Sequence, residues 1–324
     1  MKNIPIQENI VQQNTVERFI TLLRQQRLAH AYLFVGPMGV GKRETARCIA
    51  QMVHCGKNAL PCGQCSASLR VASGNHPDAL VIDSGEDDSI KIIKVRELIQ
   101  RTQLKPFESQ KKIFIIHDVE KMTLEGSNAL LKTLEEPSVD TLMILTTAFP
   151  ENVLATVKSR CHVIQFVPAS QQQLSSLLAQ RCELSPESSQ VIGYFAQGCL
   201  GRALNLHQTK FLQRKNEIID QVVLRKDNET YLKTVLSDKT KIKEMLTVLL
   251  YWFRDVLLLK VRVDENYMTH LDRKAELVKL ASRYSFEQLN TIIVTIMNAL
   301  SLLEENLNVK IALTLLREKI WARS

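Results

Sequence analysis

The feature that most constrains the fold is a glycine-rich loop between an apolar run, Ala31–Val35, and a helical pattern that begins at Arg43. A strand, a G-x-x-x-x-G-K loop and a helix in this order are typical of a phosphate-binding loop. Its backbone N–H groups surround a phosphate chain, and its lysine reaches the terminal phosphates. The candidate residues are Gly36, Gly39, Gly41 and Lys42.

Strands and helices alternate through the first half of the chain. The expected strands are short and rich in β-branched or aromatic residues: Ala31–Val35, Ala79–Asp83, Lys112–His117, Thr141–Thr147 and His162–Val167. The expected helices between them are Val11–Gln26, Arg43–His54, Lys91–Gln103 and Ser127–Leu134. This alternation predicts an α/β domain with a parallel sheet covered by helices.

After about Pro168 the pattern becomes helical only. Gln171–Arg181 and Pro186–Gln197 predict two helices, and apolar residues recur at helical spacing from about Leu206 to the end. We therefore expect an α/β domain over residues 1–167, a small helical domain over 168–206 and a larger helical domain over 207–324.

Composition excludes several classes of protein. Of 324 residues, 45% are apolar, which excludes disorder of the whole chain. No run of about 18 apolar residues predicts a membrane span, and the polar N-terminus lacks a secretory signal, so we expect a cytoplasmic protein with reduced thiols. The net charge of +8 fits contact with nucleic acid.

Two positions depart from an ATP-hydrolysing site. The residue after Lys42 is Arg43, where Ser or Thr would bind Mg²⁺. The third expected strand ends in His117 and Asp118, which leaves one carboxylate where two are wanted to hold Mg²⁺ and orient water. We expect no hydrolysis by this chain. Nucleotide binding at Lys42 and a loop kept only as scaffold both remain open.

Further segments indicate a family. With the loop and the altered strand end, the chain closely resembles bacterial clamp-loader AAA+ subunits, and the two departures resemble the delta-prime type within that family. The segments that carry the resemblance are Arg27–Phe34, Gly74–Asp78, Asn128–Pro137 and Ser159–Cys161. The specific motifs cover about residues 27–167, and beyond them the likeness is one of layout.

The resemblance implies an architecture, partners and a role. Residues 1–167 would form an AAA+ P-loop domain, 168–206 its lid and 207–324 an oligomerisation collar. The chain would join gamma/tau and delta subunits in a DNA polymerase III clamp loader, a hetero-oligomer within a DNA-directed DNA polymerase holoenzyme (a nucleotidyltransferase complex). That loader places a sliding clamp on primed DNA. Arg160, in Ser-Arg-Cys, would be an arginine finger for the neighbouring ATP site. The alternative is an active ATPase of the gamma/tau type.

A cysteine cluster is the metal candidate. Cys55, Cys62 and Cys65 include a C-x-x-C pair that suits tetrahedral zinc. The resembling family carries a four-cysteine zinc module here, over residues 55–68, but Ser68 stands at the fourth position. Serine is a poor zinc ligand, so a zinc site and a metal-free loop both remain open. We expect Cys48, Cys182 and Cys199 to be core residues.

Other polar residues suggest supporting roles. Glu135 and Glu136 precede Pro137 and predict a helix end with an interaction or positioning role. Thr147 lies near where the resembling ATPases keep a phosphate-sensing residue. No base-reading motif is present, so any DNA contact would be with phosphates and not sequence-specific. The basic candidates for it are Lys105, Lys111, Lys112, Lys158, Arg160 and Lys239–Lys243.

Overall fold

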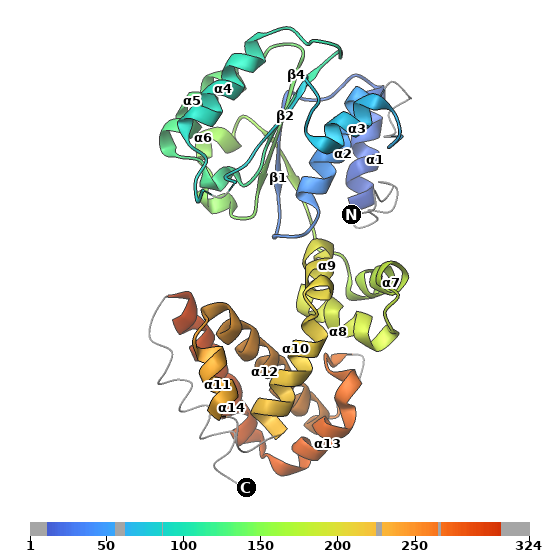
Figure 1. Ribbon diagram of the computed structural model, residues 1–324, viewed down its shortest axis with the longest axis vertical. Helices are drawn as coiled ribbons and strands as arrows, with labels where there is room; N and C mark the ends of the chain where they lie inside the picture. The colour runs from blue at the N-terminus through green and yellow to red at the C-terminus, as the bar shows by residue number, and fades with distance from the viewer. Residues whose placement is uncertain (1–11, 56–61, 86, 225–228, 265–266, 306–324) are drawn as a thin grey trace. The chain divides into compact units, whose positions relative to one another are not determined.

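A computed structural model describes residues 12–55, 62–85, 87–224, 229–264 and 267–305 (Figure 1). The chain divides into two compact units, considered separately below. The first contains residues 1–170 and 198–202, and the second contains residues 171–197 and 203–324. The predicted division of the helical region into a lid and a collar stays a prediction.

The first unit contains a five-stranded parallel sheet with the order β2-β3-β4-β1-β5. The strands are β1 Ala31–Val35, β2 Ala79–Ile82, β3 Lys112–Ile116, β4 Thr141–Thr147 and β5 His162–Gln165. Strand β1 lies between β4 and β5, so Phe34 of β1 lies opposite Thr146 on one side and Ile164 on the other. The predicted α/β class and all five strands are confirmed, with three strands ending one or two residues early.

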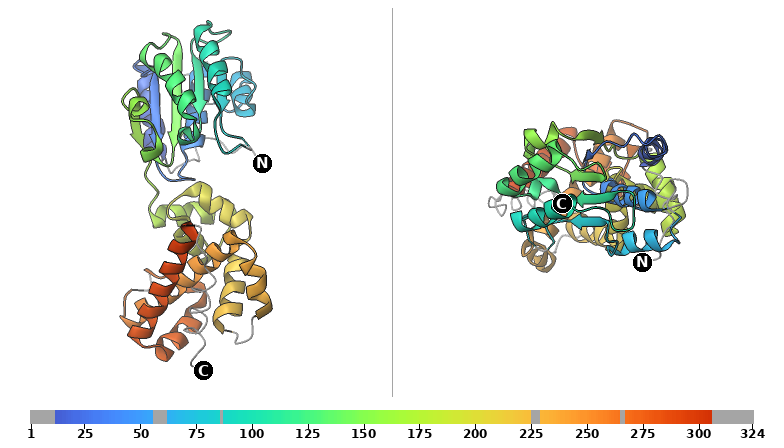
Figure 2. Two further views of the ribbon diagram at one scale, coloured as in Figure 1. Left: turned by 90° about the vertical axis from the view of Figure 1, so that its left-hand side faces the viewer. Right: turned by 90° about the horizontal axis from the view of Figure 1, so that it is seen from above.

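Helices cover both faces of this sheet (Figures 1 and 2). They are α1 Gln13–Arg24, α2 Lys42–His54, α3 Ser66–Ser73, α4 Ile92–Gln103, α5 Leu124–Glu135 and α6 Ala155–Lys158, with short 3₁₀ turns η3 Val119–Lys121 and η4 Pro150–Asn152. Side chains alternate along a strand. Tyr32 and Phe34 therefore join the core under α1 and α2, whereas Leu33 joins the core under α4 and α5.

The predicted helices differ from the observed ones mainly at their first residues. Helix α5 begins three residues before the predicted Ser127 because the Thr123 side chain accepts a hydrogen bond from the Gly126 N–H. Helix α1 begins at Gln13, and the predicted first residue Val11 lies outside the described part of the chain. Helix α3, within the cysteine module, was not predicted.

The described residues of the second unit are helical. The elements are α7 Gln171–Cys182, α8 Pro186–Ala196, α9 Leu200–Gln208 (which begins in the first unit), α10 Phe211–Ile218, the π-helical turn η5 Ile219–Leu224, α11 Glu229–Leu236, α12 Lys239–Lys260, the 3₁₀ turn η7 Leu271–Arg273, α13 Lys274–Arg283 and α14 Phe286–Glu304. Trp252 and Phe253 of α12 are fully buried at the centre of the helical core. The prediction of a helical second half is confirmed.

Among the described residues, one helix is long and apolar enough to cross a membrane by length and composition alone, although the sequence offered no continuous apolar run. It is Phe286–Leu303 of α14, with a mean hydropathy of 1.3. The core helix of a globular protein passes the same test. Of this window 28% is buried, and Leu289, Ile292 and Ile296 pack in the same core as Trp252.

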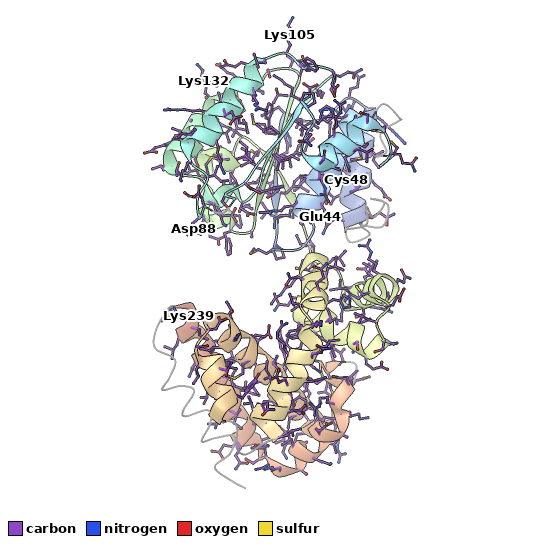
Figure 3. The ribbon with its side chains drawn as sticks, in the orientation of Figure 1. Glu44, Cys48, Asp88, Lys105, Lys132 and Lys239 are labelled. Carbon is purple, nitrogen blue, oxygen red and sulfur yellow. The ribbon has the colours of Figure 1, made fainter. Side chains whose placement is uncertain are left out.

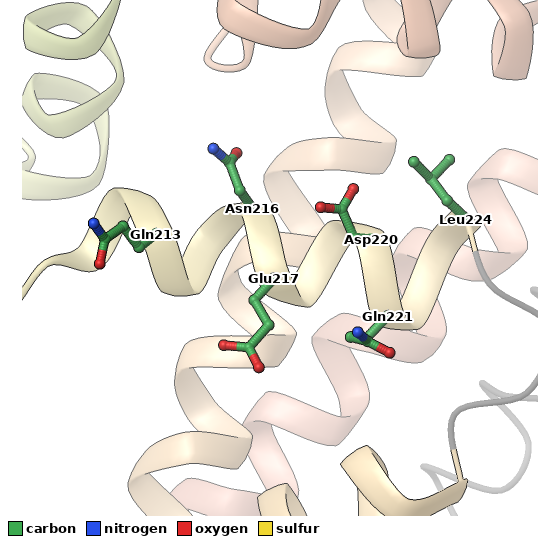
Figure 4. Close-up of a pocket in the computed structure, with 6 residues that line it drawn as sticks. All are labelled: Gln213, Asn216, Glu217, Asp220, Gln221 and Leu224. Atoms are coloured by element: carbon green, nitrogen blue, oxygen red, sulfur yellow. The ribbon is translucent and has the colours of Figure 1, made fainter.

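The second unit also contains a surface hollow of about 620 Å³ (Figure 4). Its lining comes from α10 and η5: Gln213, Asn216, Glu217, Asp220, Gln221 and Leu224. The polar side chains are amides and carboxylates. The phosphate-binding loop predicted from the sequence lies in the other unit.

Candidate functional site

The glycine-rich loop has the geometry that its sequence predicted. It leaves buried β1, and the left-handed Gly41 (φ 108°) is the N-cap of α2. A Cβ on Gly36 would lie 2.5 Å from the Phe166 carbonyl oxygen. A Cβ on Gly39 (φ 78°) would lie 2.8 Å from the backbone nitrogen of Arg202. Glycine is required at both positions because neighbouring backbone approaches this closely.

Lys42 lies inside the loop. Its side chain is 6% exposed, and Nζ donates hydrogen bonds to the carbonyl oxygens of Gly36 (2.5 Å) and Pro37 (2.9 Å). Burial lowers the pKa of the ammonium, and the charge of Asp118 opposes that effect. The lysine that a phosphate ligand would use is therefore bound to its own loop.

Arg43 occupies the position where a P-loop holds its metal ligand. Arg43 Nη2 lies 2.6 Å from Asp118 Oδ2. This ion pair joins the first turn of α2 to the N-cap of η3, the short turn that follows β3. In an ATP-hydrolysing site Mg²⁺ connects these two elements. Here an arginine of the chain itself supplies the positive charge beside the carboxylate.

His117 completes the altered acidic strand end. Its side chain is buried, and Nδ1 lies 3.4 Å from Thr146 Oγ1. Burial, reinforced by the charge of Arg43, lowers its pKa to about 4. The imidazole is therefore neutral at pH 7. Asp118 is the only carboxylate of this residue pair.

Thr146 is a site residue that the sequence analysis missed. Its hydroxyl also accepts a hydrogen bond from the Asp118 N–H at 3.3 Å. The predicted candidate Thr147 points elsewhere, because its Oγ1 accepts from the Phe149 N–H at 3.1 Å. Successive residues of a strand face opposite sides of the sheet. Thr146 and not Thr147 therefore lies beside the altered strand end, and the phosphate-sensing role of Thr147 stays a prediction.

Two other segments contact the loop. The Gln12 side-chain amide donates to the carbonyl oxygens of Val40 and Val167, a pairing that no sequence motif indicated. The Gly201 N–H donates to the Gly39 carbonyl oxygen at 2.9 Å. Both contacts fall on adjacent residues of the loop, Gly39 and Val40.

Arg160 lies away from the loop, just after α6. Its side chain is one-third exposed and forms an ion pair with Glu135 at the end of α5. Arg160 Nε donates to Glu135 Oε1 at 2.8 Å, and Nη1 donates to the Thr156 carbonyl oxygen at 2.9 Å. The predicted finger is therefore accessible, with a carboxylate of its own chain as partner.

The three candidate cysteines come together. Their sulfur atoms all lie within 4.8 Å of one another, and the Sγ atoms of Cys55 and Cys65 are 3.9 Å apart. Sulfurs that share one tetrahedral zinc at about 2.3 Å are about 3.8 Å apart, so the donor set fits zinc. Hydrogen bonds from the backbone N–H groups of Gln64 and Cys65 lower the pKa of Cys62 to about 6. Residues 56–61 of the predicted module lie outside the described residues.

Ser68 stands beside this cluster, fully buried on the first turn of α3. Its Oγ lies 3.2 Å from Cys65 Sγ. The side chain of His54, which adjoins Cys55, has Nδ1 2.8 Å from Ser109 Oγ and its ring stacked on His76. Cys48 and Cys199 are buried, as predicted, but Cys182 is only partly buried and does not belong to the core.

Two family models and several relatives match this chain. A family model described as DNA polymerase III, delta subunit, matches residues 11–170, and its C-terminal counterpart matches residues 209–317. The chain is 27% identical to the DNA polymerase III subunit delta' of Bacillus subtilis, over 93% of this chain and 94% of that protein.

The chain belongs to the DNA polymerase III clamp-loader subunit family. A second clamp-loader relative, the delta' subunit of Pseudomonas aeruginosa, is 40% identical over 41% of this chain and 42% of that protein. The tau/gamma subunit of Haemophilus influenzae is 31% identical over 65% of this chain but only 32% of that longer protein.

Among the basic residues expected to contact DNA in a clamp loader, one was assigned wrongly. Lys112 is 5% exposed, and its Nζ donates to the carbonyl oxygens of Arg101 and Thr102. It therefore caps the end of α4. Lys105 is exposed at the surface of the first unit (Figure 3).

Proposed function

We propose that this chain is a clamp-loader subunit of the delta-prime type that does not hydrolyse ATP and supplies Arg160 to a neighbouring subunit. The observation that carries the first part is the Arg43–Asp118 ion pair. A guanidinium has only hydrogen-bond donors, so Arg43 cannot ligate Mg²⁺, which takes oxygen ligands. Neutral His117 stands at the neighbouring position, where a second carboxylate would orient or activate water.

Arg160 supports the second part of the proposal. Its guanidinium is always charged and presents planar donors that suit a γ-phosphate. The contacts that hold it are at a partly exposed surface, where an exchange of partners costs little. In its assembly the chain would join gamma/tau and delta subunits in the cytoplasm, contact the sliding clamp indirectly and meet primed DNA through phosphates alone. We assign residues 168–206 to a lid and 207–324 to a collar.

The cysteine cluster has a structural role in this proposal. Cys55, Cys62 and Cys65 would hold one zinc ion, which would supply a fixed cross-link between the end of α2 and the start of α3. Their sulfur spacing supports that assignment. Ser68 would leave the fourth position without a thiolate.

The experiment is ATP binding and turnover by the purified chain alone, with Mg²⁺. We expect no turnover, with or without weak binding. A tau/gamma-type ATPase is the second candidate, because the chain is 31% identical to a tau/gamma subunit over 219 residues. Mg²⁺-dependent turnover that Lys42→Ala abolishes would favour that candidate and contradict the proposal.

A further inference from the structure

Four hydrogen bonds hold the guanidinium of Arg160, and they fall into two kinds. Nε and Nη2 both donate to Glu135 Oε1, a charged acceptor. Nη1 donates to two neutral acceptors, the Thr156 carbonyl oxygen and Ser159 Oγ. The Ser159 hydroxyl itself donates to the Thr156 carbonyl oxygen, which fixes that side of the arrangement.

Both elements that carry the pair are anchored in one core. Leu134 is next to Glu135, and Val157 is three residues before Arg160. Both are 1% exposed in the core under α4 and α5. Glu135 is the last residue of α5, whose end is fixed by the Glu136 N–H bond to the Lys132 carbonyl oxygen. The carboxylate is thus presented from a rigid helix end at the surface.

We infer that Glu135 is a positioning residue for Arg160, an inference that rests on the proposed function of Arg160. Glu135 holds the Nε edge of the guanidinium. The neutral contacts of Nη1 are the ones that a γ-phosphate of the neighbouring subunit replaces, since hydrogen bonds to an anion are roughly twice as strong. Arg160 then reaches the phosphate with its plane already set.

The pair contributes geometry more than stability. The side chains of Arg160 and Glu135 are 33% and 48% exposed, and an ion pair this accessible adds little to folding. Variants of Glu135 should therefore fold normally. Glu136 is a matched control, since it is the same residue type at the C-cap one position along, whereas the Arg160 guanidinium donates to Glu135, Thr156 and Ser159.

The test uses the complete clamp loader assembled from this chain with its gamma/tau and delta subunits. ATP hydrolysis is measured with saturating clamp and primed DNA. We expect Glu135→Ala to lower kcat by about tenfold with little change in KM for ATP, because misplacement of a catalytic group by about 1 Å has effects of this size or more. Glu135→Gln keeps an oxygen acceptor for Nε and should restore most of the rate, and Glu136→Ala should leave it unchanged.

A double variant separates positioning from a general structural role. Once Arg160→Ala has removed the finger, Glu135→Ala should lower kcat no further, since residues that act through one another are not additive. An unchanged or raised kcat in Glu135→Ala, while Arg160→Ala lowers it, would overturn the inference and leave the proposed function standing. If Arg160→Ala itself leaves kcat unchanged, the proposed function fails and the inference with it.

Discussion

Replacement of Arg43 by threonine tests whether the Arg43–Asp118 pair takes the place of a metal ion. The two charged atoms are 2.6 Å apart, and the side chains are 50% and 22% exposed. At this exposure the loss of the pair should cost at most about 1 kcal/mol of folding free energy. In a unit of this size that corresponds to roughly 2–4 °C in Tm, so the variant should remain folded.

The larger effect should be on metal dependence. Arg43→Thr removes a positive charge beside Asp118 and adds a hydroxyl oxygen of the kind that P-loops use for Mg²⁺. Two unit charges about 4 Å apart interact by about 1 kcal/mol in water and about 4 kcal/mol near a protein surface. Removal of the repulsion should therefore strengthen Mg²⁺–ATP binding by at least about fivefold relative to ATP with EDTA.

Calorimetric titration of ATP, with and without Mg²⁺, measures this ratio. Arg47→Thr is the control, because Arg47 is an exposed arginine one turn further along α2. We expect the ratio to rise in Arg43→Thr only. A wild-type chain that already binds ATP in a Mg²⁺-dependent way, or an Arg43→Thr variant without any gain, would refute the reasoning.

Two further predictions concern acid stability and zinc. His117 has a pKa of about 4 in the folded chain against an ordinary value of 6.5, so between these values the unfolded chain binds a proton that the folded chain does not. This difference should cost about 3 kcal/mol of stability as the pH falls from 7 to 4. Denaturant titrations should show a weaker loss over this range in His117→Gln, and an identical pH profile would contradict the burial argument. Ser68→Cys should place a fourth sulfur beside Cys65 and raise the zinc retained after dialysis against EDTA, as measured by atomic absorption. Equal zinc in wild type and variant would argue against a shared site.

The sequence predicts elements well here because their signals are local. The buried strand Ala31–Val35 is a continuous apolar run. The loop that follows this strand needs glycine where neighbouring backbone approaches closely. The same local logic identified Arg43 and His117 as departures. The predicted start of α5 was wrong because the capping hydrogen bond of Thr123 sets where that helix begins.

Long-range pairings were not predictable in this way. The partners Arg43 and Asp118 are 75 residues apart, and Arg160 and Glu135 are 25 residues apart. No periodicity relates their side chains, which meet only when the sheet order places their elements together. Lys112 was assigned to DNA contact from its charge alone. Its burial at the start of β3, with Nζ donating to the end of α4, is another long-range pairing that the sequence does not show.

The most direct test of the central claim is steady-state ATP hydrolysis by the assembled clamp loader containing Arg160→Ala in this chain. Size-exclusion chromatography should show an intact complex, and ATP binding should be little changed. The account predicts that the clamp- and DNA-stimulated contribution of the neighbouring ATP site falls by about 10³-fold, as for arginine fingers supplied in trans. An intact complex that hydrolyses ATP at the wild-type rate would contradict it.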